Sequence, residues 1–310
     1  MPLRLLAASG GLALSLAAGP YPPEAGLEGS TALSSEDPAI VAWATGWTDY
    51  LPGPEASETF QTPDLALGPA TPPGARDPFD IVSLGRGGSI VLTFAWPIAD
   101  GPGADFAVFE NANVPGFLEL AFVEVSSDGL NYVRFPSDSL TPEPVGPFAN
   151  TMFADNIDGL AGKYEIGYGT PFDLADLAGT EGLDLGAITH LRLIDIVGDG
   201  NTTDTSGDPI FDPYPTSGSA GFDLDAVAVL HRAAIPPPAD TTLTTQTDGS
   251  LRLGWTGQAG LTYRVERSPD LSTWSLLESR PATESGSDAV DLPALGAGPE
   301  FYRVRAVLED

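Results

Sequence analysis

Leu120-Ala-Phe-Val-Glu-Val-Ser-Ser-Asp-Gly-Leu-Asn-Tyr-Val-Arg-Phe135 is the stretch that decides the fold class. Its two apolar runs, 120–125 and 132–135, are rich in the β-branched and aromatic residues that favour strands. Between them lies the pair Asp128-Gly129, which has the turn chemistry of a tight hairpin. The stretch therefore predicts two antiparallel strands joined by a short loop.

Similar short runs follow one another from residue 38 to residue 232, and several alternate apolar with polar side chains. Such alternation predicts strands with one face on a core and the other in water. The 36 glycines and 30 prolines punctuate these runs and disfavour long helices. Only Phe172 to Leu177 indicates a short helix, with Thr170 as its cap and Pro171 in its first turn. The sequence thus predicts an all-β, antiparallel β-sandwich region.

A second series of strands follows a proline-rich break. Residues 233–241 contain Pro236-Pro-Pro238, which favours an extended spacer and predicts a linker. Residues 242–310 then carry about 70 residues of short alternating strands, typical of a small β-sandwich.

The chain begins with the pattern of an export signal. In residues 1–19, Arg4 precedes a short apolar stretch, and small residues follow it. Residues 20–37 read as a polar leader. No later stretch reaches membrane-spanning length, so we expect a secreted or cell-surface protein.

Charge and cysteine content exclude several function classes. The formal net charge is −30, from 43 acidic and 13 basic residues, and this charge disfavours nucleic-acid partners. It suits metal cations, although solubility or salt adaptation accounts for it equally well. There is no cysteine, so disulfides, thiolate metal sites and cysteine nucleophiles are excluded.

The second series resembles a fibronectin type III-like module. The resemblance lies in Leu253 and Trp255, in Tyr263-Arg-Val-Glu-Arg-Ser-Pro-Asp-Leu-Ser-Thr-Trp274, and in Phe301-Tyr-Arg-Val304. It implies that Trp255, Tyr263, Trp274 and Tyr302 occupy core or tyrosine-corner positions. Such modules are spacers or adhesive units, and this one is shorter than the typical domain.

Residues 38–232 resemble bacterial secreted "cell-surface protein" sequences with a galactose-binding-like, discoidin-like jelly roll. The matches are Val82-Ser-Leu-Gly-Arg-Gly-Gly-Ser-Ile-Val-Leu-Thr-Phe94, Gly101-Pro-Gly-Ala-Asp-Phe-Ala-Val-Phe-Glu-Asn111, Phe122-Val-Glu-Val-Ser-Ser-Asp-Gly-Leu-Asn-Tyr132 and Gly221-Phe-Asp-Leu-Asp-Ala-Val227. The resemblance implies a jelly-roll β-sandwich. It defines no biochemical role beyond a carbohydrate ligand by analogy.

An acidic, glycine-rich stretch from Asp195 to Asp208 is the first candidate metal site. Ca²⁺ prefers six to eight oxygens from carboxylates, amides and backbone carbonyls. A loop with such oxygens could surround one ion through Asp195, Asp199, Asn201, Asp204 and Asp208. The alternative is that these side chains serve turn geometry by bonding to nearby backbone.

Asp223 and Asp225 extend this candidate calcium site. Spaced two apart in a predicted strand, they share a face, where their repulsion would be relieved by a cation. Glu110 and Asn111 end another predicted strand and could approach from the opposite side.

Candidate ligand-binding residues are Trp47, Tyr50, Asn111 and Tyr214. Exposed aromatic rings stack on the apolar faces of sugars. For the tryptophan cluster at 43–50, core packing is the competing interpretation.

Catalytic constellations are scarce. His190 and His231 lack metal-ligand spacing, and no Gly-x-Ser-x-Gly elbow occurs. We therefore expect a non-catalytic binding protein, stabilised by calcium, with carbohydrate or another extracellular polymer as its partner. The alternatives are a structural or adhesive surface protein, and a polysaccharide hydrolase that pairs Glu110 with Glu119 or Glu124.

Overall fold

A computed structural model describes residues 19–75, 79–292 and 299–308. The predicted export segment therefore lies outside the described residues, apart from Gly19. Within them, regular structure is β-strand with short 3-10 turns, so the predicted all-β class is confirmed. The described chain contains no helix with the length and apolar character needed to cross a membrane.

Two antiparallel sheets form the larger sandwich. The first has the order β1 (Leu33–Ser34), β11 (Tyr168–Phe172), β6 (Phe106–Glu110), β15 (Asp223–Val229), β2 (Ala42–Trp43), and β4 (Val82–Ser83) also pairs with β15. The second has the order β3 (Gly46–Leu51), β5 (Ser89–Ile98), β12 (Ile188–Asp195), β7 (Ala121–Ser126), β8 (Val133–Arg134). The chain passes from sheet to sheet between β5 and β6, β6 and β7, and β11 and β12. This is jelly-roll connectivity.

Short elements complete this region. Two ribbons pair β9 (Asp138–Ser139) with β10 (Ile157–Asp158), and β13 (Asp199–Thr203) with β14 (Pro209–Phe211). The 3-10 turns are η1 (Glu58–Phe60), η2 (Pro63–Ala66), η3 (Ala154–Asn156) and η4 (Leu174–Leu177).

The predicted hairpin at 120–135 is present. Strand β7 pairs with β8 through Glu124 opposite Arg134 and Val125 opposite Val133. In the loop, Asp128 Oδ1 accepts hydrogen bonds from the backbone N–H groups of Leu130 and Asn131, both at 2.8 Å. The turn is therefore stabilised by local side-chain-to-backbone bonds.

The prediction of a short helix at 172–177 is wrong in the type of helix and in its first residue. Thr170 and Pro171 lie within β11 rather than at a helix start, and only the 3-10 turn η4 follows. Asp173 caps this turn, since its Oδ1 accepts a hydrogen bond from the Ala175 N–H at 2.9 Å. The residues that were predicted to cap and start the helix instead pair with β6, as part of β11.

The core lies between the two sheets, where Phe106, Phe135 and Phe172 pack ring to ring with centroids 5.1–5.8 Å apart. The prediction that alternating strands have one face in water fails for β6, β7 and β15, which are buried along their whole length. The outer faces are covered by two further apolar clusters, one around Trp43 and Phe109 and the other around Phe122 and Ile157.

Two three-stranded sheets form the C-terminal sandwich. Their orders are β16 (Ala239–Thr245), β17 (Leu251–Gly257), β20 (Gly286–Leu292), and β19 (Ser275–Pro281), β18 (Thr262–Ser268), β21 (Phe301–Val307). Trp255 and Tyr263 are buried in its core. Trp274 differs from the expectation: it is half-buried outside the apolar core cluster, with the Arg303 guanidinium 3.9 Å from the ring centroid. Tyr302 is half-buried.

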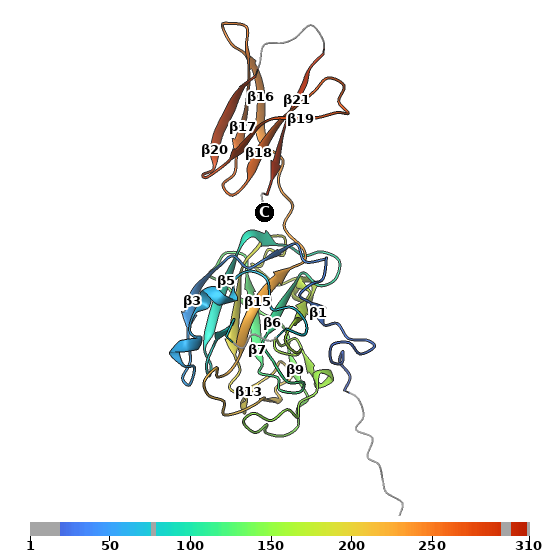
Figure 1. Ribbon diagram of the computed structural model, residues 1–310, viewed down its shortest axis with the longest axis vertical. Coiled ribbons are helices and arrows are strands. Elements are labelled where there is room, and N and C mark those ends of the chain that lie inside the picture. Colours follow the sequence, from blue (N-terminus) through green and yellow to red (C-terminus); the bar gives the residue numbers. More distant parts are fainter. Residues whose placement is uncertain (1–18, 76–78, 293–298, 309–310) are drawn as a thin grey trace, which may run out of the picture.

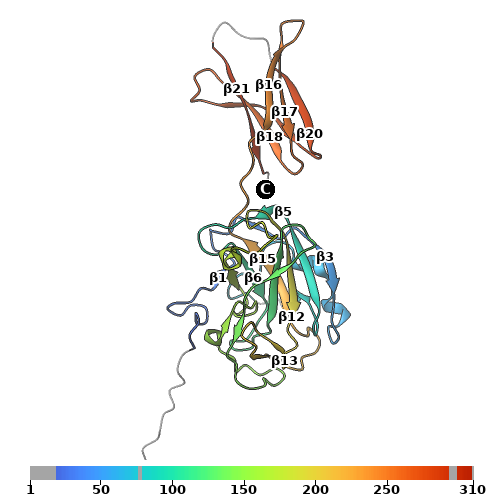
Figure 2. The ribbon, with the colours of Figure 1, turned by 180° about the vertical axis from the view of Figure 1, so that it is seen from behind.

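The two sandwiches lie end to end (Figures 1 and 2), joined by the segment between β15 and β16. The last residue of β15, Val229, leads into this connection, so its first residue, Asp223, lies toward the opposite end. The ribbons β9–β10 and β13–β14 lie at that same far end. The loops there are consequently free of the C-terminal sandwich.

Candidate functional site

Antiparallel pairing brings two acidic strand ends together at the far end of the jelly roll. Glu110, the last residue of β6, lies opposite Leu224 in the β6–β15 register. The Asn111 N–H donates to the Asp223 carbonyl at 3.2 Å. The strand end that carries Glu110 is thus fixed beside the strand start that carries Asp223, as the positions of the two predicted strands indicated.

A pocket of about 420 Å³ opens above these strand ends. Three loops complete its wall: 111–119 between β6 and β7, 148–150 after β9, and 216–219 before β15. Its lining residues are Glu110, Asn111, Asn113, Val114, Phe117, Glu119, Phe148, Asn150, Thr216, Ser217, Ser219 and Asp223. The pocket has the size and loop setting of a small-molecule site.

Three buried carboxylates form the floor of this pocket: Glu110, Glu119 and Asp223, with 2%, 3% and 7% of their surface exposed. Each accepts at least one hydrogen bond: Glu110 from the Asn111 and Ala112 N–H groups, Glu119 from the Thr216 hydroxyl, and Asp223 from Ser219. Each also has one oxygen without a hydrogen-bond partner, namely Glu110 Oε2, Glu119 Oε1 and Asp223 Oδ1. The floor therefore offers three buried acceptor atoms that the chain does not satisfy.

Burial and mutual repulsion disfavour the charged forms of these acids. Burial raises the pKa of Glu110 and of Glu119 well above the ordinary range, and the charge of Asp223 raises both further. Burial raises the pKa of Asp223 to about 7. The three acids therefore hold protons more strongly than exposed carboxyl groups do, and their ionised forms require compensation, for example by a cation.

The rim is apolar and amide-rich. Phe148 is 66% exposed and has a φ of 61°, in the region that non-glycine residues rarely adopt. Val114 is exposed and Phe117 is half-buried. Together with the three asparagines of the wall, they place flat apolar surface and amide groups around an acidic floor.

The predicted calcium loop is organised differently. The Asp199 carboxylate accepts hydrogen bonds from the Asn201 N–H at 3.0 Å and from the Asn201 side-chain amide at 2.8 Å. Asp204 accepts from the N–H groups of Ser139, Ser206 and Asp208 at 2.9–3.0 Å. These bonds fit the turn-geometry interpretation, and the structure does not bring Asp199, Asp204 and Asp208 together as one tight group.

Asp195 and Asp225 are buried beside the pocket but are absent from its lining. Asp195 accepts from the N–H groups of Gly87 and Phe222, both at 2.7 Å, and so joins β12 to the start of β15. Asp225 lies at a bulge in β15, where its Oδ2 accepts from the Thr71 N–H at 2.9 Å. Of the predicted calcium residues, Glu110 and Asp223 alone line the pocket.

Of the predicted ligand-binding residues, Asn111 alone lines the pocket. Trp47 lies on β3, where its Nε1–H donates to Asp64 at 2.6 Å. The Tyr50 hydroxyl donates to the Ser83 carbonyl at 2.7 Å, and the Tyr214 ring lies 5.1 Å from the Arg86 guanidinium. These aromatic residues therefore have structural contacts away from the pocket.

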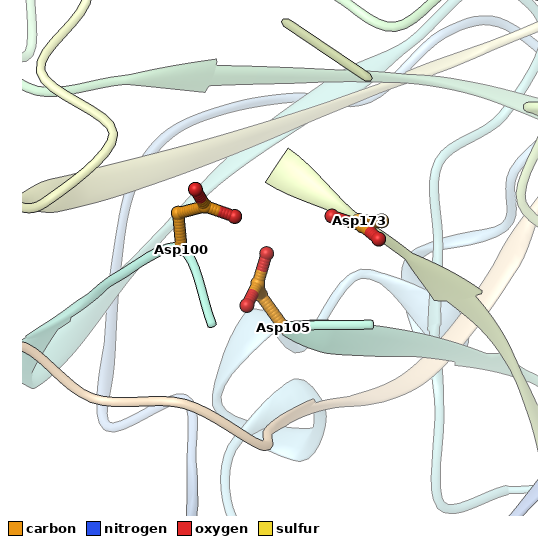
Figure 3. A group of neighbouring side chains, drawn as sticks. All are labelled: Asp100, Asp105 and Asp173. Carbon is orange, nitrogen blue, oxygen red and sulfur yellow. The ribbon is translucent and has the colours of Figure 1, made fainter. Parts of the chain in front are cut away.

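Another acidic group lies near the start of β6 (Figure 3). In the described parts of the chain, Asp100, Asp105 and Asp173 are the three acids whose oxygens all lie within 4.8 Å of one another. Asp105 is already satisfied, because it accepts from the Gly101 N–H, the Leu174 N–H and the His231 ring at 2.7–2.8 Å. Asp173 caps η4. This group joins loops and offers a ligand no unsatisfied buried atom.

Sequence reasoning missed most of the pocket wall. Glu119 was predicted only as a partner in a hydrolase pair, and its one local signal is its position between the buried residues Leu118 and Leu120. Glu124, the other predicted partner of Glu110, lies on β7, where it accepts hydrogen bonds from Arg134 at 2.9 Å and Arg192 at 2.6 Å. The structure brings together Glu110 and Glu119, and not Glu110 and Glu124.

No protein-family model and no curated protein matches this chain.

Proposed function

We propose that this chain is a secreted or cell-surface binding protein that takes a carbohydrate group of an extracellular polymer into the pocket between β6, β7 and β15. The observation that carries the proposal is the open, 420 Å³ pocket whose floor presents buried acceptor atoms without partners. Sugar hydroxyls are donors that match such acceptors.

The rim supports the same ligand class. Carbohydrate sites combine an aromatic surface, on which an apolar sugar face stacks, with a few directional polar groups. Phe148 and Phe117 supply the aromatic surface, and the amides of Asn111, Asn113 and Asn150 supply the directional polar groups. In this proposal the C-terminal sandwich is a spacer, since the pocket lies at the other end of the jelly roll.

A glycan array probed with the purified full chain tests the proposal. We expect binding to a restricted set of glycans, lost in Phe148→Ala because the stacking surface is removed. Phe79→Ala is the matched control, since Phe79 is 64% exposed and is not part of the pocket. Absence of binding to every glycan by the wild-type chain would favour the structural or adhesive alternative.

A hydrolase is the second candidate, because Glu110 and Glu119 share one pocket and burial raises the pKa of both. Glycoside hydrolysis requires a protonated and an ionised carboxyl group on either side of the scissile bond. Turnover of a polysaccharide by the wild-type chain, abolished in both Glu110→Gln and Glu119→Gln, would establish this reaction and replace the binding proposal.

A further inference from the structure

The pocket floor gathers acidic side chains from three separate segments. Glu110 ends β6, Glu119 precedes β7 and Asp223 begins β15. All three are more than nine-tenths buried, and each has one oxygen without a partner. Burying an ionised carboxylate costs several kcal/mol unless a positive charge or hydrogen bonds compensate it. A ligand that satisfies all three at once would remove this penalty.

The surrounding chain supplies no compensating charge. The residues that line the pocket include no Lys, Arg or His. The nearby Arg86 pairs with Glu55 at 2.9 Å. Lys163 lines a different cavity, with its ammonium 5.6 Å from the Tyr164 ring centroid. In their ionised forms the three carboxylates are therefore compensated only by a cation from outside the chain.

We propose that Glu110, Glu119 and Asp223 bind a divalent cation, Ca²⁺ by its ligand chemistry, at the floor of the pocket. The atoms on offer are hard oxygens: three carboxylates, and the neutral side chains of Asn111, Thr216 and Ser219. Hard oxygen sets select Ca²⁺ or Mg²⁺, whereas Zn²⁺ and Cu²⁺ favour nitrogen and sulfur ligands. Two carboxylates at strand ends and one from a loop, with further oxygens nearby, fit the six to eight ligands of Ca²⁺ better than the strict octahedron of Mg²⁺.

Ca²⁺ does not require its carboxylate ligands to lie in contact with one another. Their oxygens do not all lie within 4.8 Å of one another, unlike those of Asp100, Asp105 and Asp173. Oxygens on opposite sides of Ca²⁺ lie about 5 Å apart, because each bond is about 2.3–2.6 Å long. Since the pocket is open above its floor, coordination positions remain for water or for ligand hydroxyl groups.

The role of this ion in ligand recognition rests on the proposed function: sugar hydroxyls would complete its coordination. Binding of the cation does not depend on the proposed function, because it is measured without carbohydrate. Failure of the glycan array would thus leave the cation site standing, and failure of cation binding would leave carbohydrate recognition to be judged by the array.

The test is calorimetric titration of CaCl₂ into the full chain after removal of metals with a chelator, together with thermal unfolding. We expect one Ca²⁺ bound to this site, and a midpoint of unfolding raised by roughly 5–10 °C when free Ca²⁺ exceeds the Kd a hundredfold. Glu110→Gln and Glu119→Gln keep the side-chain shape but remove a charged ligand. They should weaken Ca²⁺ binding at least roughly tenfold.

Asp208→Asn is the matched control, because it removes an exposed acid of the 199–208 loop and should leave Ca²⁺ affinity unchanged. Glu119→Gln should unfold in chelator at or above the wild-type midpoint, which shows that its loss of Ca²⁺ is not a loss of folding. The proposal is overturned if Ca²⁺ produces neither heat nor a shift in midpoint. It is equally overturned if Asp208→Asn loses Ca²⁺ while Glu119→Gln retains it, since the ion would then occupy the loop.

Discussion

Asn111 donates its backbone N–H to the carbonyl of Asp223 at 3.2 Å, and this bond joins the end of β6 to the start of β15. It is the last link of a ladder whose other bonds hold Phe106 to Glu110 against Leu224 to Val229. Because both strands are buried along their length, the ladder is rigid, and the two acids at its end are held beside each other. The site is therefore built on sheet geometry on this side and on loops elsewhere.

Two buried acids outside the pocket lining, Asp195 and Asp212, predict an unusual pH dependence of stability. Burial raises the pKa of Asp195 to about 7, and burial raises that of Asp212 well above its ordinary range. In the unfolded chain both titrate near pH 4. Between about pH 4 and pH 7 the folded state binds more protons, so the free energy of unfolding should fall as pH rises, by about 1.4 kcal/mol for each unit of pKa shift.

Urea unfolding at several pH values between 4.5 and 7.5, in chelator, measures this slope. Asp195→Asn should make the slope shallower, because it removes one of the titrating groups. Asp208→Asn, in an exposed loop, should leave it unchanged. A wild-type stability that rises steadily across this range would contradict the expectation.

Gly221 is predicted to tolerate no side chain. Its φ is 66°, and a Cβ there would lie 2.4 Å from Asp195 Oδ1. Gly221→Ala should lower the free energy of unfolding by more than the roughly 1–2 kcal/mol of the left-handed conformation alone. Gly218→Ala, with a φ of 94° and no atom within 4 Å of the added Cβ, isolates the conformational part. Equal losses in the two variants would show that the contact with Asp195 is unimportant.

The sequence was most informative where structure is local. The 120–135 hairpin followed from strand propensity and the Asp128-Gly129 turn, because both act within a few residues. The proximity of Glu110 to Asp223 followed from their positions at strand ends. The Asp199 to Asp208 loop shows the limit of this reasoning, since Asp, Asn and Gly at short spacing serve turns and ion sites alike.

The rest of the site depends on contacts between distant segments. Phe148 and Thr216 meet Glu110 only because long loops return over one end of the sandwich, and no local pattern encodes that return. The buried outer faces of β6 and β15 have the same origin, since the segment around Trp43 covers them. A strand predicted to face water was in fact covered by chain far away in sequence.

Trp96 is predicted to couple the two sandwiches. It lies on β5, is 8% exposed, and belongs to the same apolar cluster as Leu251 and Tyr263 of the C-terminal sandwich. Its Nε1–H donates to the Ala233 carbonyl at 2.9 Å. Trp96→Ala should cost about 3 kcal/mol and separate calorimetric unfolding into two transitions. Trp96→Phe, which loses only the hydrogen bond and part of the ring, should cost about 1 kcal/mol.

Asp105 is predicted to be a structural acid and not an ion ligand. It is completely buried and accepts from Gly101, Leu174 and His231, so Asp105→Ala leaves two backbone N–H groups and a ring nitrogen without their acceptor. We expect a loss of about 3–5 kcal/mol in urea unfolding. His231→Ala removes one of these donors and should cost less.

Calorimetric titration of Asp105→Asn should still give one Ca²⁺ bound with wild-type affinity. Loss of Ca²⁺ in this variant alone would place the ion among Asp100, Asp105 and Asp173 instead of the pocket floor.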